Sequence, residues 1–563
     1  MRPWLRRPPD RAAVLVVCIV VVVLGALALG KGLTGPPSSA ASASPGSAST
    51  DESASGSDSP PAACVGVPVR PGDDLQKASD SHPEGTTFCL TAGVHRLASV
   101  VPKRGQRFVG EGAKTVLSGA KVLDPARAVS DGADRWYWSD QTQQDWRRGT
   151  LIPPGSAEAP NEGDLFSQEL FVTTSGQWGD EPVRLRRVTT LAELRPGCWY
   201  LDQSAHRLYL AQDPRVLGLI ETSLTPTAIT APTGSQSSDV TIENLVIEKY
   251  ASPIQVAAVG GPGARDWTIR WVTVRYNHGT GIEMGPGTLV EHSQIRDMGQ
   301  EGLDGGGDAV DRPTVLRASE VAFNRTLSVD PEWDAGGAKF THAYHQGLVV
   351  ENCWFHHNFG YGLWLDIDND GVIIRSNRIE ANDRAGIHFE VSRNAQIYWN
   401  EVFGQTNGPD GGVFDGAGIW INNSERVDLH DNLIQDNDNG ILVTEDPLAR
   451  RAGTFRDGIP HVDRVDIHDN DIHMIRGITG MRIEGGDATS YWSGNHVVFS
   501  HNVYRLDPAR DRFLGPGNTN YTFREWQGLG NDRNSVLRPV GTLGSLGDGA
   551  TPFVMSDYGA QAD

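Results

Sequence analysis

The sequence predicts an all-β fold in which about ten or more short coils stack into a solenoid. Two observations carry this prediction. Between Val240 and Tyr504 a rung recurs, with an x-Asn-x-apolar step, a turn and a glycine. Within each rung, apolar and polar residues alternate, which is the period of a half-buried strand and not of a helix. The asparagine step is clearest at Asn377, Asn400, Asn432, Asn470 and Asn502, and we expect these side chains to hydrogen-bond along the stack.

The overall charge narrows the class of partner. The chain has 563 residues and a formal net charge of −21. Nucleic-acid binding requires a basic surface, so no nucleic-acid partner is expected.

The N-terminus predicts export. Four arginines precede the apolar stretch Ala12–Gly30, which is long enough to cross a bilayer. Residues 1–31 are therefore predicted to be a signal anchor or transmembrane segment. The alternative is a cleaved signal peptide, with Ala26-Leu27-Ala28 as the cleavage site. Either case places the remainder outside the cytoplasm, anchored to the membrane or secreted. Residues 32–63 are rich in Ser, Ala and Pro and are predicted to be a disordered linker.

The cysteines fit an oxidising compartment. Cys64 and Cys89 flank the first folded segment, and we predict a disulfide between them. Cys198 and Cys353 are expected to be buried thiols.

The rungs resemble those of a known superfamily. Segments such as IIRSNRIEANDRAGIHFE and VDLHDNLIQDNDNGILVT resemble the right-handed parallel β-helix (pectin lyase-like) superfamily, over roughly Cys64 to Ser535. The resemblance implies a right-handed parallel β-helix and a polysaccharide partner. It does not imply a reaction, because this scaffold hosts lyases, hydrolases, epimerases and non-catalytic adhesins. The motif series of polygalacturonases and of classical pectate lyases are missing from the sequence.

The resemblance also implies the domain order. We expect entry coils and an N-terminal cap at 64–125, with a short helix around Leu75–Ser79. A small β-rich insertion follows at 126–235, the parallel β-helix at 236–535 and a tail at 536–563. A helix bearing Trp526 should cover the last coil, with the tryptophan in the core. The segments around Lys339, Asp366 and His388 further resemble an exported actinobacterial-type β-helix group, from which no reaction is carried over.

Alternation also predicts an outward face. When the rungs are aligned on the glycine that begins their second strand, residues two and four positions later point outward. The first outward column reads Glu283, Asp304, Lys339, Trp364, His388, Trp420, Leu442 and Arg482. The second reads Thr341, Asp366, Glu390, Asn422, Thr444 and Glu484.

Four residues of these columns are predicted to be catalytic: Lys339, Asp366, His388 and Glu390. Two carboxyls one coil apart share a proton or bind a cation. The first arrangement suits a glycoside hydrolase. The second suits a lyase in which Lys339 or His388 removes a proton beside a uronate. The alternative is a structural salt bridge from Lys339 to Asp366 or Asp334.

Neighbouring side chains are predicted to bind sugar. Trp364 and Trp420 would stack on sugar rings. Polar groups would bind the sugar hydroxyls, namely Asp304, Glu283, Asn422 and Arg482. Under the alternative, long loops such as Gln405–Ala417 cover this face and the tryptophans serve packing.

A metal site is a further alternative. Asp366, Asp368 and Asp370 match the first half of a Ca²⁺ loop, but Asn377 stands where that loop requires glutamate. The predicted function is that of an extracellular polysaccharide lyase or glycoside hydrolase, monomeric and without a required cofactor. The competing class is a non-catalytic carbohydrate-binding or adhesion protein.

Overall fold

A computed structural model describes residues 63–132, 134–143, 162–174, 181–235, 237–409, 411–445, 461–474, 476–483, 496–507 and 510–540. All of them belong to one compact unit, Ser59–Asp563. The predicted anchor at 1–31 and nearly all of the predicted linker at 32–63 lie outside the described residues. No helix within the described ranges is long and apolar enough to span a membrane.

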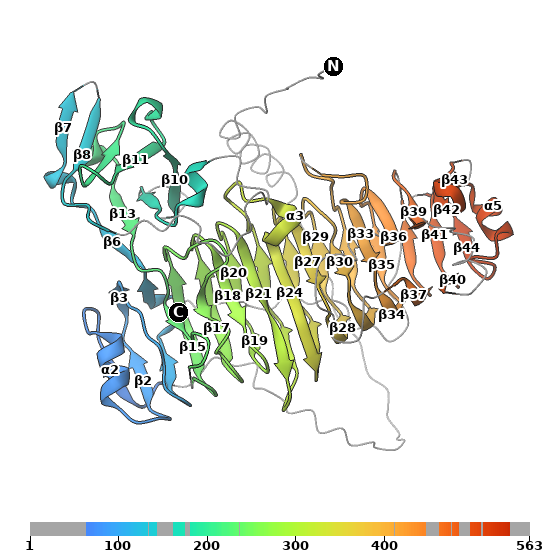
Figure 1. The fold of residues 1–563 in the computed structure, drawn as a ribbon, viewed down its shortest axis with the longest axis horizontal. Coiled ribbons are helices and arrows are strands. Elements are labelled where there is room, and N and C mark those ends of the chain that lie inside the picture. The colour runs from blue at the N-terminus through green and yellow to red at the C-terminus, as the bar shows by residue number, and fades with distance from the viewer. Residues whose placement is uncertain are drawn as a thin grey trace, which may run out of the picture. The chain divides into compact units, whose positions relative to one another are not determined.

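Strands of successive coils pair in parallel and form three faces of a stack (Figure 1). The first two faces share β15 and β17 and together form a 24-stranded sheet, and the third is a 12-stranded sheet. This is the predicted parallel β-helix. The first face contains β1 (Val67–Val69), β2 (Thr87–Leu90), β4 (Arg107–Val109), β15 (Thr241–Glu248), β17 (Thr268–Arg275), β19 (Leu289–Glu291), β22 (Thr314–Arg317), β25 (Leu348–Glu351), β28 (Asp370–Arg375), β31 (Arg393–Tyr398), β34 (Glu425–His430), β37 (Asp463–His468) and β40 (Val497–Ser500). The second adds β3 (Gly93–Arg96), β5 (Thr115–Ser118), β20 (Gln294–Arg296), β23 (Glu320–Ala322), β26 (Trp354–His356), β29 (Arg378–Glu380), β32 (Glu401–Phe403), β35 (Leu433–Gln435), β38 (Asp471–His473), β41 (Val503–Arg505) and β44 (Val536–Arg538).

The third face carries the predicted site. Its strands are parallel except for the last pair, β42 and β43. They are β14 (Ile229–Thr230), β16 (Ala257–Gly260), β18 (Thr280–Met284), β21 (Glu301–Ala309), β24 (Gly336–His345), β27 (Tyr361–Asp366), β30 (Ile387–Glu390), β33 (Ala417–Asn422), β36 (Asn439–Glu445), β39 (Thr479–Ile483), β42 (Phe513–Gly515) and β43 (Thr519–Tyr521).

Amide ladders hold the corners of the stack. In the predicted column, the Asn377 side chain donates to Asn400 Oδ1 at 3.0 Å, and Asn400 donates to Asn432 Oδ1 at 2.9 Å. The residue before each ladder position adopts a positive φ, as Ser376 does at 55°. This sharp bend leaves backbone groups without strand partners, and the amide satisfies them. A second ladder runs through Asn324, Asn358, Asn382, Gln405 and Asn437, and a third through Asn369, Ser392 and Ser424.

Helices cover both ends of the stack. The helix α2 (Leu75–Ser81) buries Leu75 against the first coils. At the other end α5 (Phe523–Gly528) buries Trp526 against Phe513, with ring centroids 5.5 Å apart. Each helix covers one end of the stack, where the apolar core and the edges of the outermost strands would otherwise be exposed. The remaining short helices are α3 (Pro331–Asp334), η1 (Gly112–Lys114), η2 (Pro125–Arg127), η3 (Glu162–Leu165), η4 (Leu191–Glu193), η5 (Pro214–Val216) and η7 (Pro516–Asn518).

The insertion forms its own sheet beside the N-terminal coils (Figure 1). Trp199 lies at the centre of a separate apolar cluster and is fully buried. Two thiols are buried in the described part of the chain, Cys198 in this sheet and Cys353 in the stack, while Cys64 and Cys89 form a disulfide. The strands of the insertion are β6 (Ala120–Val122), β7 (Val129–Gly132), β8 (Arg135–Trp138), β9 (Leu170–Thr173), β10 (Pro182–Val188), β11 (Cys198–Asp202), β12 (Arg207–Leu210) and β13 (Leu219–Ser223).

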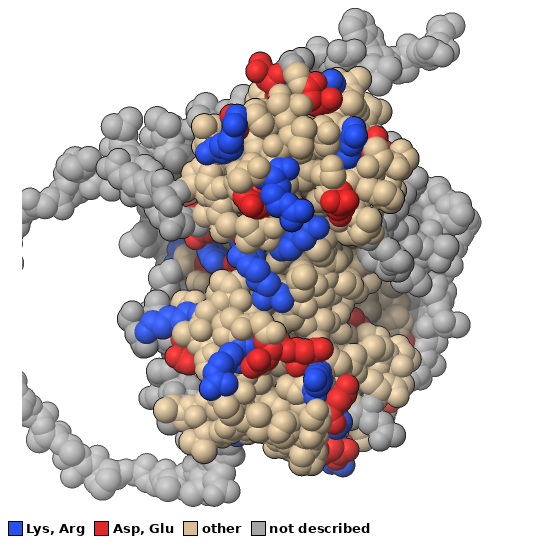
Figure 2. All heavy atoms as spheres, turned by 90° about the vertical axis from the view of Figure 1, so that its left-hand side faces the viewer, with Lys and Arg blue, Asp and Glu red and all other residues tan. Residues whose placement is uncertain are grey.

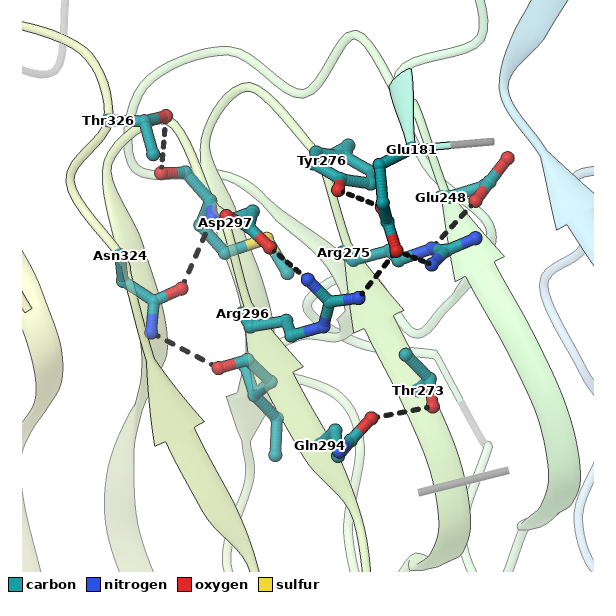
Figure 3. Close-up of polar contacts among 12 residues, drawn as sticks. Glu181, Glu248, Thr273, Arg275, Tyr276, Gln294, Arg296, Asp297, Asn324 and Thr326 are labelled. Carbon is teal, nitrogen blue, oxygen red and sulfur yellow. Dashed lines mark hydrogen bonds and ion pairs between the residues drawn. The ribbon is translucent and has the colours of Figure 1, made fainter. Parts of the chain in front are cut away.

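Ion pairs fasten the insertion to the stack. Glu181, directly before β10, reaches between Arg275 and Arg296 and accepts a hydrogen bond from the Tyr276 hydroxyl at 2.5 Å (Figure 3). On the face that shows the N-terminal coils and the insertion, charged side chains of both signs are interspersed on a mostly uncharged surface (Figure 2). The Glu181 contacts therefore link the insertion to β17 and β20 of the stack.

Candidate functional site

Strand pairing places the predicted outward residues in columns on the third face. Residue by residue, Asp304 pairs with Lys339, Lys339 with Trp364, Trp364 with His388, and His388 with Trp420. In the second column Thr341 pairs with Asp366, and Glu390 with Asn422. Register alone brings Lys339, Asp366, His388 and Glu390 into adjacent coils.

Arg482 is the exception to the predicted columns. It pairs with Thr444 and therefore lies in the second column, while Gly480 occupies the first beside Leu442. Alignment on Gly480 is wrong by two residues. This glycine has a φ of 120°, and a side chain there would collide with the Leu514 backbone oxygen. It marks a close approach of two strands and not the beginning of a rung.

Lys339 is held by acids and by an aromatic ring. Its ammonium lies 3.0 Å from Asp366, 3.5 Å from Asp334 and 3.6 Å from the Trp364 ring centroid. It also donates to the Trp333 carbonyl of α3 at 2.7 Å. Burial opposes its charge, but the carboxylates of Asp366 and Asp334 outweigh burial and raise the pKa of Lys339. Lys339 therefore stays protonated at neutral pH and is no base there. Its contact with Asp366 is the salt bridge of the structural alternative.

Glu390 is a carboxyl that keeps its proton. Burial and the neighbouring Asp366 raise the pKa of Glu390 to about 8, although Lys339 counteracts them. Its two oxygens accept hydrogen bonds from Trp364 Nε1 at 3.1 Å and Asn422 Nδ2 at 2.9 Å. These donors fix the orientation of the carboxyl group. At neutral pH Glu390 is therefore a positioned acid beside Asp366.

His388 is sandwiched between the two tryptophans. Its ring stacks on Trp420 at 4.2 Å and on Trp364 at 5.6 Å. The residue is 2 % exposed, and neither ring nitrogen has a hydrogen-bond partner among the described residues. Burial, with a smaller effect of Lys339, holds the pKa of His388 well below its usual value. The imidazole is therefore neutral, and its Nε2 lies 3.7 Å from Glu390.

The third face is hollowed above these residues. The pocket has a volume of about 290 Å³. Its floor is the aromatic row of Trp364, His388 and Trp420 with Glu390 beside it. Its walls come from the loop before β33 and from α3. The lining residues are Glu332, Tyr361, Trp364, His388, Glu390, Gly412, Val413, Phe414, Asp415 and Trp420.

The tryptophans are less open than a flat sugar-binding platform requires. Trp364 is 5 % exposed, and Trp420 is half-buried against Phe414, with ring centroids 6.0 Å apart. The loop that carries Phe414 lies within the segment Gln405–Ala417. The expectation of an exposed ring is therefore wrong for Trp364, because Tyr361, His388 and the Lys339 ammonium pack against this ring. Both rings still line the pocket.

Four predicted binding residues lie outside the pocket lining. Glu283 and Asp304 follow the column beyond Lys339, on the side away from the pocket. Burial raises the pKa of Glu283 to about 7 and that of Asp304 well above its usual value. The Asn422 side chain donates a hydrogen bond to Glu390, and the Arg482 guanidinium lies 5.3 Å from the centroid of the Phe414 ring. These four residues therefore lie among other residues of the protein and not at the pocket.

The three aspartates of the predicted Ca²⁺ loop do not converge. Asp366 pairs with Lys339, Asp368 lies 3.3 Å from Arg393, and Asp370 accepts from Asn394. Among the described residues, no group of three or more acid, histidine or cysteine side chains is arranged to hold a metal. Asn369 between them belongs to a ladder, which explains the turn without a cation.

Tyr361, Asp415 and Glu301 were missed by the sequence reasoning. The Tyr361 ring packs at a tilt against His388, with ring centroids 4.9 Å apart, and its hydroxyl donates to Asp415 at 3.1 Å. Glu301 is 1 % exposed, and burial raises its pKa well above the usual value. Tyr361 and Glu301 each precede an alignment glycine, a position that alternation assigns to the interior. Asp415 lies in a loop, where no repeat signals a role.

The comparisons with known proteins agree with this architecture. Residues 235–414 match the family described as "Right handed beta helix region". No curated protein matches the sequence. The structure of XylC in complex with xylose covers 83 % of this chain and 83 % of its own, with 13 % identity and a TM-score of 0.59. The A-module of the mannuronan C-5 epimerase AlgE6 from Azotobacter vinelandii covers 83 % of this chain and 95 % of its own, with 13 % identity and a TM-score of 0.45. At such identities similarity establishes the fold alone, and the XylC comparison carries it. The chain is therefore a right-handed parallel β-helix protein.

Proposed function

We propose that this protein is a glycoside hydrolase acting on an extracellular polysaccharide, with Glu390 as the general acid and Asp366 as its partner carboxylate. The observation that supports this most is the state of Glu390. It is a protonated carboxyl at the edge of a pocket, held by Trp364 and Asn422, with Asp366 in the neighbouring strand. Two carboxyls whose environments differ are what acid-assisted glycoside cleavage requires.

The reaction balances with these two groups and one water. Glu390 gives its proton to the glycosidic oxygen as the bond from that oxygen to the anomeric carbon breaks. Water supplies the hydroxyl that the anomeric carbon gains. The remaining proton of this water passes to the partner carboxylate, Asp366. The Lys339 ammonium lies 3.0 Å from Asp366 and stabilises the ionised form of Asp366 before this step. Lys339 is a positioning residue here.

A hydrolase is favoured over a lyase by the protonation of the site. A lyase needs a base for the proton beside the uronate carboxylate. Lys339 is protonated, and His388 is enclosed between two rings. The fold also accommodates a sugar ligand in XylC. The Cys64–Cys89 disulfide supports a location outside the cytoplasm.

The test is a screen of the full chain against xylan, glucomannan, arabinan, galactan, alginate and polygalacturonate, with and without a chelator. We expect new reducing ends from a neutral polymer, chelator-insensitive and without ultraviolet absorbance from an unsaturated product. Glu390→Gln should abolish turnover, and Glu401→Gln, an acid on the second face, should leave it unchanged. Full activity of Glu390→Gln refutes the assignment. Binding without cleavage of any polymer indicates the carbohydrate-binding class instead.

A further inference from the structure

The outward column is closed on the side of the pocket nearer the N-terminus. Lys339, next to Trp364 in the column, is 7 % exposed. It is bound from above by α3, through the Trp333 carbonyl at 2.7 Å and the Asp334 carboxylate at 3.5 Å. A polysaccharide chain following the column in this direction would run into α3.

The column is also closed on the other side. Leu442, next to Trp420, is fully buried. It shares an apolar cluster with Phe414 of the loop and Ile478, which precedes β39. A sugar stacked on Trp420 therefore meets Phe414 before it can reach the next coil.

Buried contacts fix the wall that carries Phe414. Asp415 is 5 % exposed, forms an ion pair with the buried Arg384 and accepts from the Tyr361 hydroxyl at 3.1 Å. Arg384 also lies 3.5 Å from Glu332 of α3. Removing one partner of a buried ion pair strongly destabilises the fold, because the other charge stays buried without compensation. The wall is therefore a built part of the site.

Among the described residues, three strands of the column, β27, β30 and β33, line the pocket between the walls. Neighbouring strands lie about 4.8 Å apart, so the floor from Trp364 to Trp420 measures about 10 Å. The volume of about 290 Å³ lies at the lower end for small-molecule pockets, roughly 300–1,000 Å³. This space suits one sugar ring with part of its neighbour, and not a chain that runs along the column past both walls.

The charges of the pocket favour a neutral sugar. The acidic groups that line it are Glu332, Glu390 and Asp415. Of the cations beside it, Lys339 is engaged by Asp366 and Arg384 by Asp415, and Arg482 lies over the Phe414 ring. A uronate would have to displace one of these pairs in a low-dielectric site, which is costly.

We infer that the pocket receives the terminal residue of a neutral polysaccharide, so that the enzyme acts from chain ends. This inference rests on the proposed hydrolase function and specifies its substrate class. Each cleavage then releases one small sugar, and the remaining chain stays outside the walls.

The first products of defined oligosaccharides test this inference. Xylopentaose, cellopentaose, mannopentaose and galactopentaose, each labelled at the reducing end, are incubated with the full chain and sampled at low conversion. Action from a chain end gives a monosaccharide and a tetrasaccharide first. Disaccharide and trisaccharide as first products overturn the inference and leave the hydrolase proposal standing. If none of the four, and no polymer of the screen, is cut, both proposals fail.

A wall variant adds a second test. Phe414→Ala removes the side chain that closes the column at Leu442 and should give a severalfold rise in the share of disaccharide and trisaccharide products. Phe323→Ala is the matched control, because Phe323 is a partly exposed residue that stacks on His357, away from the pocket. An unchanged product pattern for Phe414→Ala overturns the role of this wall.

Discussion

Replacing Asn400 by alanine tests how strongly the ladders hold the coils together. The Asn400 side chain is fully buried. Its Oδ1 accepts from the backbone N–H and the side-chain amide of Asn377, at 3.1 and 3.0 Å. Its amide donates to Ile374 O at 3.0 Å, Tyr398 O at 3.1 Å and Asn432 Oδ1 at 2.9 Å. One truncation therefore affects three neighbouring coils.

The magnitude follows from the groups that lose their partner. Asn400→Ala removes the acceptor of the buried Asn377 N–H. The Asn377 side chain loses one of two acceptors and keeps Val350 O. A buried polar group left unsatisfied costs about 1–3 kcal/mol. With the lost second bond, we expect local destabilisation of about 2–4 kcal/mol. A loss of about 2 kcal/mol corresponds to a roughly 30-fold larger equilibrium constant for local opening.

Hydrogen exchange read by mass spectrometry measures this opening locally, which suits a long repeat whose unfolding need not be two-state. Peptides containing Asn377 should exchange at least about 30-fold faster in the variant than in the wild type. Asn534→Ala, at an exposed position, is the control and should leave the rate unchanged. Equal exchange in both variants would refute the reasoning and assign the coil contacts to the apolar core alone.

Three further predictions concern the site and the N-terminal cap. Activity that needs protonated Glu390 should fall as pH rises through about 8. Lys339→Met should move this fall in activity to higher pH, because Lys339 lowers the pKa of Glu390. A pH–rate profile in which the fall does not move counts against the assignment. The pKa of Glu390 is higher in the folded protein than in the unfolded chain. Its contribution to the free energy of unfolding is therefore full below the usual glutamate pKa and is lost as pH rises to about 8. The denaturation midpoint should fall more between pH 5 and 9 in the wild type than in Glu390→Gln, and parallel curves would contradict this. Reducing the Cys64–Cys89 disulfide, whose cysteines lie 25 residues apart, should lower the free energy of unfolding by about 3.5 kcal/mol. Denaturant unfolding with and without reductant measures this difference. No shift would mean that the loop is equally constrained in the reduced unfolded chain.

The architecture was predictable because the stack repeats one physical requirement in every coil. Each corner needs a bend with positive φ and a side chain that satisfies the freed backbone, and the sequence shows this as the step at Asn377 and Asn400. The second ladder, through Asn358 and Asn382, was overlooked. Alignment on the glycines does not bring its members together, because Asn358 and Asn382 stand 4 residues before their glycines but Asn324 and Gln405 stand 13 residues before theirs. Gln405 also breaks the asparagine pattern.

The columns of the site were predictable only as far as register extends. Alternation after glycine orders Lys339, Trp364, His388 and Trp420 correctly, because parallel pairing keeps equivalent residues side by side. It fails at Arg482, since Gly480 serves a close strand approach. The closure of the pocket was not predictable, because Phe414 and Asp415 belong to a loop without a repeat partner.

The asparagine ladder also has a direction. Every side-chain amide from Asn377 to Asn470 donates to the asparagine of the following coil, so the amide dipoles align head to tail along the stack. Aligned hydrogen bonds polarise one another and leave partial positive charge at the donor end. That end is Asn502, and its amide meets the buried Asp532 carboxylate at 3.0 Å. The β-helix thus has an electrical polarity along its axis, and the C-terminal segment supplies the counter-charge that terminates it.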